Sequence, residues 1–326
     1  MSNALLEVQN LKKYFNVANG GVLHAVDDIT FKIEEGKTLG IVGESGCGKS
    51  TLGRAILRLH EPTAGKVIYK GMDITSFSKE EMRKMRQHMQ IIFQDPYASL
   101  NPRFTISQII EEPLVLHKVY KSEAERKARV AELMELVGLS PRMANLYPHE
   151  FDGGRRQRVV IARAMSINPK FVVCDEPVSA LDVSVQAQIL NLMMELQEKM
   201  GLTYIFISHD LSVIKHISDD IGVMYLGQMI EKTSKKAIFS RPLHPYTVAL
   251  LSAIPSTNVR EKKKKIILKG EISSPINPKP GCRFAPRCPF ATEACFKKNP
   301  QLIEVEKDHF VACHRSAEMM EGKLHY

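Results

Sequence analysis

One nine-residue stretch of the sequence, GESGCGKST, has the residue types and spacing of a phosphate-binding loop. It fits the pattern G-x-x-x-x-G-K-[ST], in which glycines let backbone N–H groups point at phosphate oxygens. We expect Lys49 to reach the β- and γ-phosphates of a nucleotide, and Ser50 to place its hydroxyl on Mg²⁺. Cys47 is interpreted as a small residue that the loop tolerates. The predicted nucleotide-binding residues of the loop are Gly43, Ser45, Gly46, Cys47, Gly48, Lys49, Ser50 and Thr51.

Two carboxylates and a histidine follow other apolar runs. Asp175 and Glu176 end the run FVVCDE. Asp175 is placed to hold Mg²⁺, directly or through water, and Glu176 to polarise an attacking water molecule. His209 follows the run TYIFIS and is a candidate contact of the γ-phosphate. With the loop, these residues predict a site that hydrolyses a nucleotide.

These residues need strands and helices to position them. The runs at 38–43, 171–176 and 203–210 are predicted to be strands of an α/β protein. Because ligands bind at the carboxyl ends of parallel strands, the three polar strand ends predict one shared site. The segment 121–139 has helical periodicity and a stop at Gly138, and residues from about 96 to 165 are predicted to form a mostly helical insertion.

Composition sets wide limits on function. The 326 residues are 44% apolar and 25% charged, which suits a globular chain of about two domains. The net charge of +9 is compatible with several partners and decides nothing; the run Lys262–Lys265 is interpreted as a solvated linker. The first residues lack the apolar core of a signal peptide, and no apolar run reaches about 18 residues, so we expect no transmembrane helix.

Four of the six cysteines crowd into the last 45 residues, beyond a charged, proline-rich stretch that follows Pro255. With no export signal expected, metal ligation is a more serious explanation than disulfides. The spacing lacks the close pairs of structural zinc sites, whereas a [4Fe–4S] cluster accepts wider spacing. We predict a cluster, with zinc or no metal as alternatives. The candidate ligands are Cys282, Cys288, Cys295 and Cys313.

Five motifs in a fixed order make the chain resemble an ABC transporter ATPase subunit, over nearly its whole length. They are the phosphate loop, IIFQDP (91–96), GGRRQRVVIARA (153–164), CDEPVSALD (174–182) and ISHD (207–210). The resemblance implies a P-loop NTPase (RecA-like) core with a mostly parallel sheet, an antiparallel β subdomain, a helical insertion and a small cysteine-containing C-terminal extension.

The resemblance also implies roles for single residues. Gln94 is similar to the glutamine that senses Mg²⁺ and the attacking water. Asp175 and Glu176 are similar to the Mg²⁺-binding aspartate and the catalytic glutamate, and His209 to the switch histidine. Phe15 aligns with the aromatic residue that stacks on adenine, and Tyr14 is a second candidate for this role. The alternative for Phe15 is a place in the hydrophobic core. Residues 179–182 are similar to the D-loop.

The sequence departs from the family at the signature, usually Ser-Gly-Gly-Gln, which here reads Asp152-Gly153-Gly154-Arg155. In the family, this motif covers the ATP held by the partner subunit. A carboxylate in place of the hydroxyl is expected to repel the γ-phosphate, and Arg155 would offset part of that repulsion. Alternatively, Asp152 caps the helix and points away. We favour an impaired signature.

The segment RPLHPYTVALLSAIP (241–255) and the cysteine tail narrow the resemblance to dipeptide and oligopeptide importers. We therefore predict an ATPase domain at 1–255 and an importer-type extension at 256–326. The resemblance implies ATP with Mg²⁺, a head-to-tail ATPase heterodimer, two permeases and an extracytoplasmic peptide-binding protein. It places the chain peripherally on the cytoplasmic face of the membrane, without nucleic acid.

Other classes remain as alternatives. ABC proteins that act on ribosomes carry two cassettes and those that repair DNA carry a long coiled coil, whereas this chain has one phosphate loop and no heptad run. A small GTPase would need an N-K-x-D motif, which is absent. Two alternatives remain: a subunit that binds ATP with little turnover, and the ATPase of an importer of another small solute.

Overall fold

The computed structural model describes residues 4–18, 20–254, 266–268, 270 and 274–324, which group into two compact units. The first unit contains residues 33–37 and 76–207, with the first residues of the chain. The second contains residues 6–32, 38–75 and the chain from 208 onward. Lys262–Lys265 and Pro255, on which the linker prediction rests, lie outside the described residues. Each unit is described by itself.

The first unit is built on three parallel strands. β7 lies between β6 and β8, with Phe171 opposite Met89 on one side and Thr203 on the other. Every residue of β7 and β8 is buried, as expected of strands covered on both faces. The strands are β6 (Met89–Ile92), β7 (Phe171–Asp175) and β8 (Thr203–Ile207).

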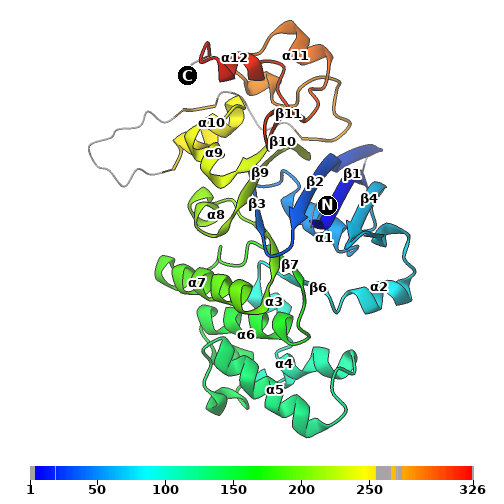
Figure 1. Cartoon of the computed structure of the whole chain (residues 1–326), viewed down its shortest axis with the longest axis vertical. Coiled ribbons are helices and arrows are strands. Elements are labelled where there is room, and N and C mark those ends of the chain that lie inside the picture. Colours follow the sequence, from blue (N-terminus) through cyan, green and yellow to red (C-terminus); the bar gives the residue numbers. More distant parts are fainter. Residues whose placement is uncertain (1–3, 19, 255–265, 269, 271–273, 325–326) are drawn as a thin grey trace. The chain divides into compact units, whose positions relative to one another are not determined.

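Helices make up the rest of the first unit, and Figure 1 shows α4, α5, α6 and α7 gathered in its green and blue-green part. α6 packs on α3, α4, α5 and α7. α4 and α5 begin at capping boxes, in which Thr105 and Ser122 accept hydrogen bonds from the N–H groups of Gln108 and Glu125. The helices are α2 (Lys79–Met85), α3 (Pro96–Ser99), α4 (Ile106–Leu116), α5 (Glu123–Leu136), α6 (Gly153–Met165) and α7 (Val183–Met200), with 3₁₀ turns η2 (Pro141–Met143) and η3 (Pro148–Glu150).

The second unit contains two sheets. In one, β3 pairs in parallel with β9, and β10, β12 and β11 continue the sheet as antiparallel neighbours. The other has the order β2-β1-β4-β5, with β4 antiparallel to β1 and β5. The strands are β1 (Ala4–Val17), β2 (Gly21–Glu34), β3 (Thr38–Val42), β4 (Ala64–Tyr69), β5 (Met72–Asp73), β9 (Asp220–Tyr225), β10 (Gln228–Ser234), β11 (Ile303–Glu306) and β12 (His309–Val311). The helices are α1 (Lys49–Ile56), η1 (Ile74–Ser76), α8 (Leu211–Ile217), α9 (Lys235–Ser240), α10 (Pro245–Ser252), η4 (Ala285–Arg287), α11 (Glu293–Lys297) and α12 (Ser316–Met320).

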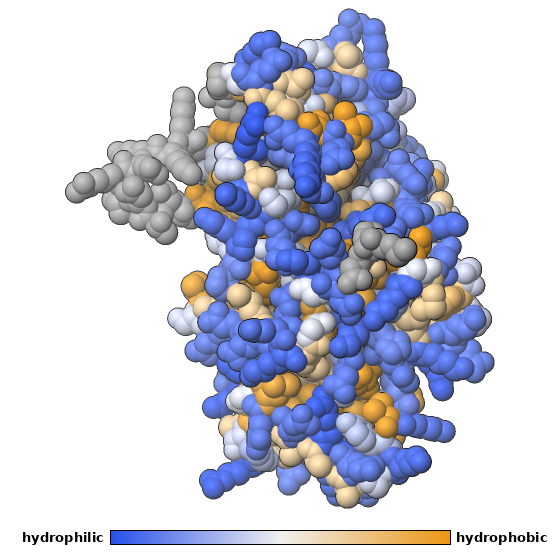
Figure 2. All heavy atoms as spheres, viewed as in Figure 1, coloured by the Kyte–Doolittle hydropathy of each residue, from blue (hydrophilic) through white to orange (hydrophobic). Residues whose placement is uncertain are grey.

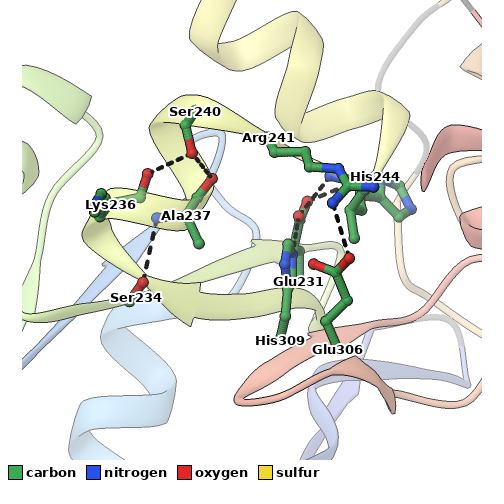
Figure 3. A network of polar contacts seen from close by, with 10 residues as sticks. Glu231, Ser234, Lys236, Ala237, Ser240, Arg241, His244, Glu306 and His309 are labelled. Atoms are coloured by element: carbon green, nitrogen blue, oxygen red, sulfur yellow. Dashed lines mark hydrogen bonds and ion pairs between the residues drawn. The ribbon is translucent and has the colours of Figure 1, made fainter. Parts of the chain in front are cut away.

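Within the second unit, a buried carboxylate on β10 joins the C-terminal strand β12 to its neighbours (Figure 3). Glu231 on β10 is 0% exposed and accepts hydrogen bonds from the N–H groups of Leu243 and His244, at 2.7 and 3.0 Å. His309 on β12 lies 2.8 Å from the same carboxylate. A buried charge needs such partners, so this cluster fixes β12 against β10.

The predicted fold class is confirmed. Strands form at each of the three predicted runs, and the predicted helix at 121–139 is α5. Parallel strands, a separate antiparallel sheet and the helices between residues 96 and 165 are all present. The division into a domain at 1–255 and an extension at 256–326 stays a prediction.

Candidate functional site

The phosphate loop connects β3 to α1, as its pattern predicts. Gly46 and Gly48 have φ angles of 77° and 104°, which favour glycine. A Cβ atom at Gly48 would lie 2.0 Å from the carbonyl oxygen of Ala25, so no other residue fits there without movement. Gly48 is the N-cap of α1, so the loop leads directly into a helix N-terminus, which favours an anion. The loop therefore fits a bound phosphate.

Lys49 points back into its own loop. Its side chain is 5% exposed, and its Nζ donates hydrogen bonds to the carbonyl oxygens of Gly43 and Glu44, at 2.8 and 3.1 Å. Cys47 is buried beside it, with its sulfur 3.8 Å from Nζ, and burial raises the pKa of this thiol. A buried ammonium held by two carbonyls is suited to exchange them for phosphate oxygens. Ser45 is exposed, whereas Ser50 and Thr51 are partly buried at the start of α1.

The first unit brings together two of the predicted catalytic residues. Asp175 is buried at the end of β7, and Glu176 follows with a φ of 48°, an uncommon angle for a residue with a side chain. The Glu176 N–H donates to the carbonyl of Ile207 at 3.0 Å, which anchors this backbone. Gln94 donates from Nε2 to Glu176 Oε2 at 3.1 Å. Backbone strain of this kind occurs at functional sites, where neighbouring contacts maintain it.

His209 and the candidate adenine-binding residues belong to the second unit. His209 is exposed, just before α8, whose first turn is capped by Asp210. Phe15 lies on β1 with its ring 5.5 Å from that of His60, in an edge-on arrangement. Tyr14 stacks on His24 at 3.9 Å and donates its hydroxyl to Asp27. The Lys13 ammonium also lies over the Phe15 ring, 4.8 Å from its centroid, so both candidate rings have neighbours and neither is singled out.

Asp152 caps α6. Its Oδ1 accepts from the N–H of Arg155 at 2.8 Å, and its Oδ2 lies 3.5 Å from Arg155 Nε. The two side chains are 62% and 51% exposed, so this ion pair is surrounded by solvent. Gly154 lies against α7, where an added Cβ would meet Val185 at 2.7 Å. The signature residues are thus placed at a helix start, and their action on a partner's ATP stays a prediction.

The predicted metal site in the tail is wrong. Among the residues that the structure describes, no group of three or more His, Cys, Asp or Glu side chains is arranged to hold a metal ion. The four cysteines instead line one cavity with apolar neighbours that include Phe284 and Phe290. Burial raises the pKa of Cys282 to about 11 and that of Cys313 to about 12, so these thiols are protonated at neutral pH. Metal ligation requires thiolates, which this apolar cavity disfavours.

Two residues that contact the phosphate loop were missed. Tyr246 on α10 accepts a hydrogen bond from the Glu44 N–H at 3.0 Å, and Arg287 in η4 donates to both carboxylate oxygens of Glu44. Tyr246 lies in the segment that carried the importer resemblance. Nothing in the local sequence marks Arg287, because its partner lies more than 200 residues away.

Within the described part of the chain, no helix is both long and apolar enough to span a bilayer. On the face in Figure 2, the coloured surface is largely hydrophilic, with hydrophobic atoms in scattered groups.

Two family models match the sequence. The model "ABC transporter" matches residues 26–179, which include the phosphate loop, Gln94, the signature and both carboxylates. The model "Oligopeptide/dipeptide transporter, C-terminal region" matches residues 230–295.

Curated relatives match over almost their whole length. The oligopeptide transport ATP-binding protein AppF of Bacillus subtilis is 54% identical, over 95% of this chain and 97% of its own. The dipeptide transport ATP-binding protein DppF of Haemophilus influenzae is 50% identical, over 95% and 96%.

Solved structures agree. The ATP-binding cassette MJ0796, solved as a dimer bound to ADP and Pi, is 29% identical with a TM-score of 0.65, over 71% of this chain and 98% of that one. CbiO1 from Clostridium perfringens, part of the transporter complex CbiONQ, is 27% identical with a TM-score of 0.65, over 76% and 93%. With a phosphate loop of this geometry and relatives of this similarity, the chain belongs to the ABC transporter ATPases, among the oligopeptide and dipeptide transport ATP-binding proteins.

Proposed function

We propose that this chain hydrolyses ATP to drive the import of dipeptides or oligopeptides through a membrane transporter. The observation that carries the proposal is the phosphate loop, with Lys49 buried at its centre. The ATPase activity follows from family membership, and the peptide substrate from the relatives that transport peptides. An importer of another small solute remains the second candidate, since this chain does not itself select the substrate.

Within the chain, the site residues bind the nucleotide and activate the attacking water. The loop N–H groups and Lys49 hold the β- and γ-phosphates, and Phe15 stacks on adenine. Glu176 orients the attacking water as general base, held in place by Gln94 through the 3.1 Å hydrogen bond. His209 contacts the γ-phosphate.

Mg²⁺ accompanies the ATP. The proposed ligands Ser50, Gln94 and Asp175 offer hydroxyl, amide and carboxylate oxygens, the donors that Mg²⁺ prefers. When bound there, Mg²⁺ would neutralise charge on the β- and γ-phosphates.

The signature is proposed to act on the ATP of a second ATPase subunit, arranged head to tail. Asp152 and Arg155 weaken the site that they complete, because a carboxylate stands where the family has a hydroxyl. A heterodimer with an intact partner signature then has one strong and one weak site. The assembly includes two permeases and an extracytoplasmic peptide-binding protein, and places this chain on the cytoplasmic face of the membrane.

The proposal is tested with the intact transporter, isolated through a tag on this chain and reconstituted in vesicles with its binding protein. We expect ATP hydrolysis to rise on addition of a tripeptide, and a labelled tripeptide to accumulate in the vesicles. The matched control carries Lys49→Ala, which should abolish both signals. Stimulation by a sugar or free amino acid, with none by peptides, would contradict the peptide substrate. Peptide binding and ATP binding without hydrolysis would support a regulatory subunit instead.

A further inference from the structure

The C-terminal part of the second unit makes direct polar contact with the phosphate loop. Arg287 Nη1 donates to Glu44 Oε2 at 2.8 Å, and Nη2 to Oε1 at 3.1 Å. This two-bond fork fixes both the position and the plane of the carboxylate. The Arg287 side chain is 8% exposed and that of Glu44 is 23% exposed, so solvent screens this pair less than a surface ion pair.

Glu44 lies where its position matters for the nucleotide. It is the second residue of the loop, and its carbonyl oxygen accepts a hydrogen bond from Lys49. Its N–H is held by the Tyr246 hydroxyl. Side chain and backbone of this one loop residue are therefore both fixed by residues from the C-terminal part of the unit.

Glu44 is also a negative charge within a loop that binds polyphosphate. Unpaired, its carboxylate would repel the incoming phosphates. Arg287 neutralises it, and the hydrogen bonds to Glu44 raise the pKa of the guanidinium, which is charged at every relevant pH. Tyr225 adds a third contact, since its hydroxyl lies 3.3 Å from Arg287 Nη1.

A second arginine supports the same part of the unit. Arg283 donates to the carboxylate of Asp27 and to the carbonyl of Leu226. Gly227, which follows Leu226 in the chain, donates its N–H to the carbonyl of Cys47 in the phosphate loop at 2.8 Å. Arg283 thus holds the turn that borders the loop, while Arg287 holds the loop itself.

We propose that Arg287 is a positioning residue for ATP. It fixes the position of the Glu44 carboxylate and neutralises its charge, and thereby makes the affinity for the nucleotide depend on the C-terminal extension. This inference rests on the proposed binding of ATP to the loop. Arg287 does not touch the nucleotide; it acts through Glu44. The C-terminal extension is then part of the nucleotide site rather than an appendage to it.

The test is a double-mutant cycle on the full-length chain, with ATP affinity measured by fluorescence of a labelled ATP analogue. We expect Arg287→Ala to weaken ATP binding about tenfold, which equals about 1.4 kcal/mol. In a chain that already carries Glu44→Ala, the same change should alter affinity by less than about twofold, because its partner is gone. Arg287→Lys keeps the charge without the fork, and should fall between wild type and Arg287→Ala.

Arg315→Ala is the matched control. Arg315 lies in the same C-terminal part of the chain and lines the cavity of the four cysteines. Its guanidinium pairs with Glu318 and donates to the carbonyl of Phe290, both outside the phosphate loop. Its loss should leave ATP affinity within about twofold of wild type. If Arg287→Ala does not fold, Arg287→Lys and Glu44→Ala carry the test.

Three results would overturn the inference. One is an Arg287→Ala protein with a lower melting temperature but unchanged ATP affinity. Another is an equal loss of affinity in both backgrounds, since Arg287 would then act on something other than Glu44. The third is an equal loss with Arg315→Ala. A wild-type chain whose ATP binding is unaffected by Lys49→Ala would instead overturn the proposed loop site together with this inference.

Discussion

Replacing Asp152 by Ser and Arg155 by Gln should strengthen ATP-dependent pairing of this chain. Asp152 uses Oδ1 to cap α6, and its Oδ2 is 3.5 Å from Arg155 Nε. Serine and aspartate are about equally good N-caps, so the change should leave the free energy of unfolding within about 0.5 kcal/mol. The effect on nucleotide hydrolysis can then be measured without a difference in folding.

The size of the gain comes from two interactions with the partner's ATP. A hydroxyl bonded to a charged phosphate contributes about 1.5–3 kcal/mol. A carboxylate about 4 Å from a phosphate charge is repelled by about 4 kcal/mol at an effective dielectric constant of about 20. Arg155 offsets part of this repulsion, but an ion pair exposed by 62% and 51% is weak. The hydroxyl alone predicts at least a tenfold gain, at about 1.4 kcal/mol for each factor of ten.

The assay is ATP hydrolysis by the isolated chain over a range of protein concentrations. The double variant should show a rate that rises steeply with concentration, and the unmodified chain should not. Asp152→Asn keeps the cap without the charge, and should recover part of the gain. Equal rates for all three proteins would mean that Asp152 points away from the partner's nucleotide, and would refute the electrostatic argument.

Three further predictions concern single residues. Glu176→Gln should lower phosphate release at least about 100-fold while ATP binding persists, because the general base is lost. His309→Ala leaves the Glu231 carboxylate buried without its side-chain partner, and should cost about 3 kcal/mol in chemical denaturation, whereas exposed His314→Ala should cost little. Burial lowers the pKa of His244 to about 3, so the stability that it contributes is present above pH 6.5 and falls by about 1.4 kcal/mol per pH unit below it. His244→Asn, which can still cap α10, should flatten this dependence in melts from pH 7 to pH 5.

Each of these predictions has a result that contradicts it. Substantial turnover by the Glu176→Gln protein would assign the base elsewhere. Equal losses of stability for His309→Ala and His314→Ala would mean that the buried contact of His309 with Glu231 stabilises the fold no more than an exposed histidine does. Parallel acid profiles for wild type and His244→Asn would show that other groups dominate the loss of stability below pH 6.5.

The strands and the phosphate loop could be predicted from the sequence because the residues that specify each of them are close neighbours in the chain. TLGIVG has an apolar run that ends in glycine, and the glycines of the loop are required where φ is positive or a backbone approaches closely. The bond from Gln94 to Glu176 could not be read from the chain, since 82 residues separate them. The metal site predicted for the four C-terminal cysteines was wrong for a related reason. Spacing shows that thiols are near in sequence, but an apolar cavity, which spacing does not reveal, decides whether they ionise.

The sequence by itself determined the phosphate loop, the family and the identity of the acidic and signature residues, because each depends on a short motif with one structural solution. Only the tertiary structure decided which residues act on those motifs from a distance. It placed Arg287 on Glu44 and Tyr246 on the loop backbone, and it buried Glu231 beneath His309. Such contacts depend on how strands and helices pack, and packing joins residues that the chain keeps far apart.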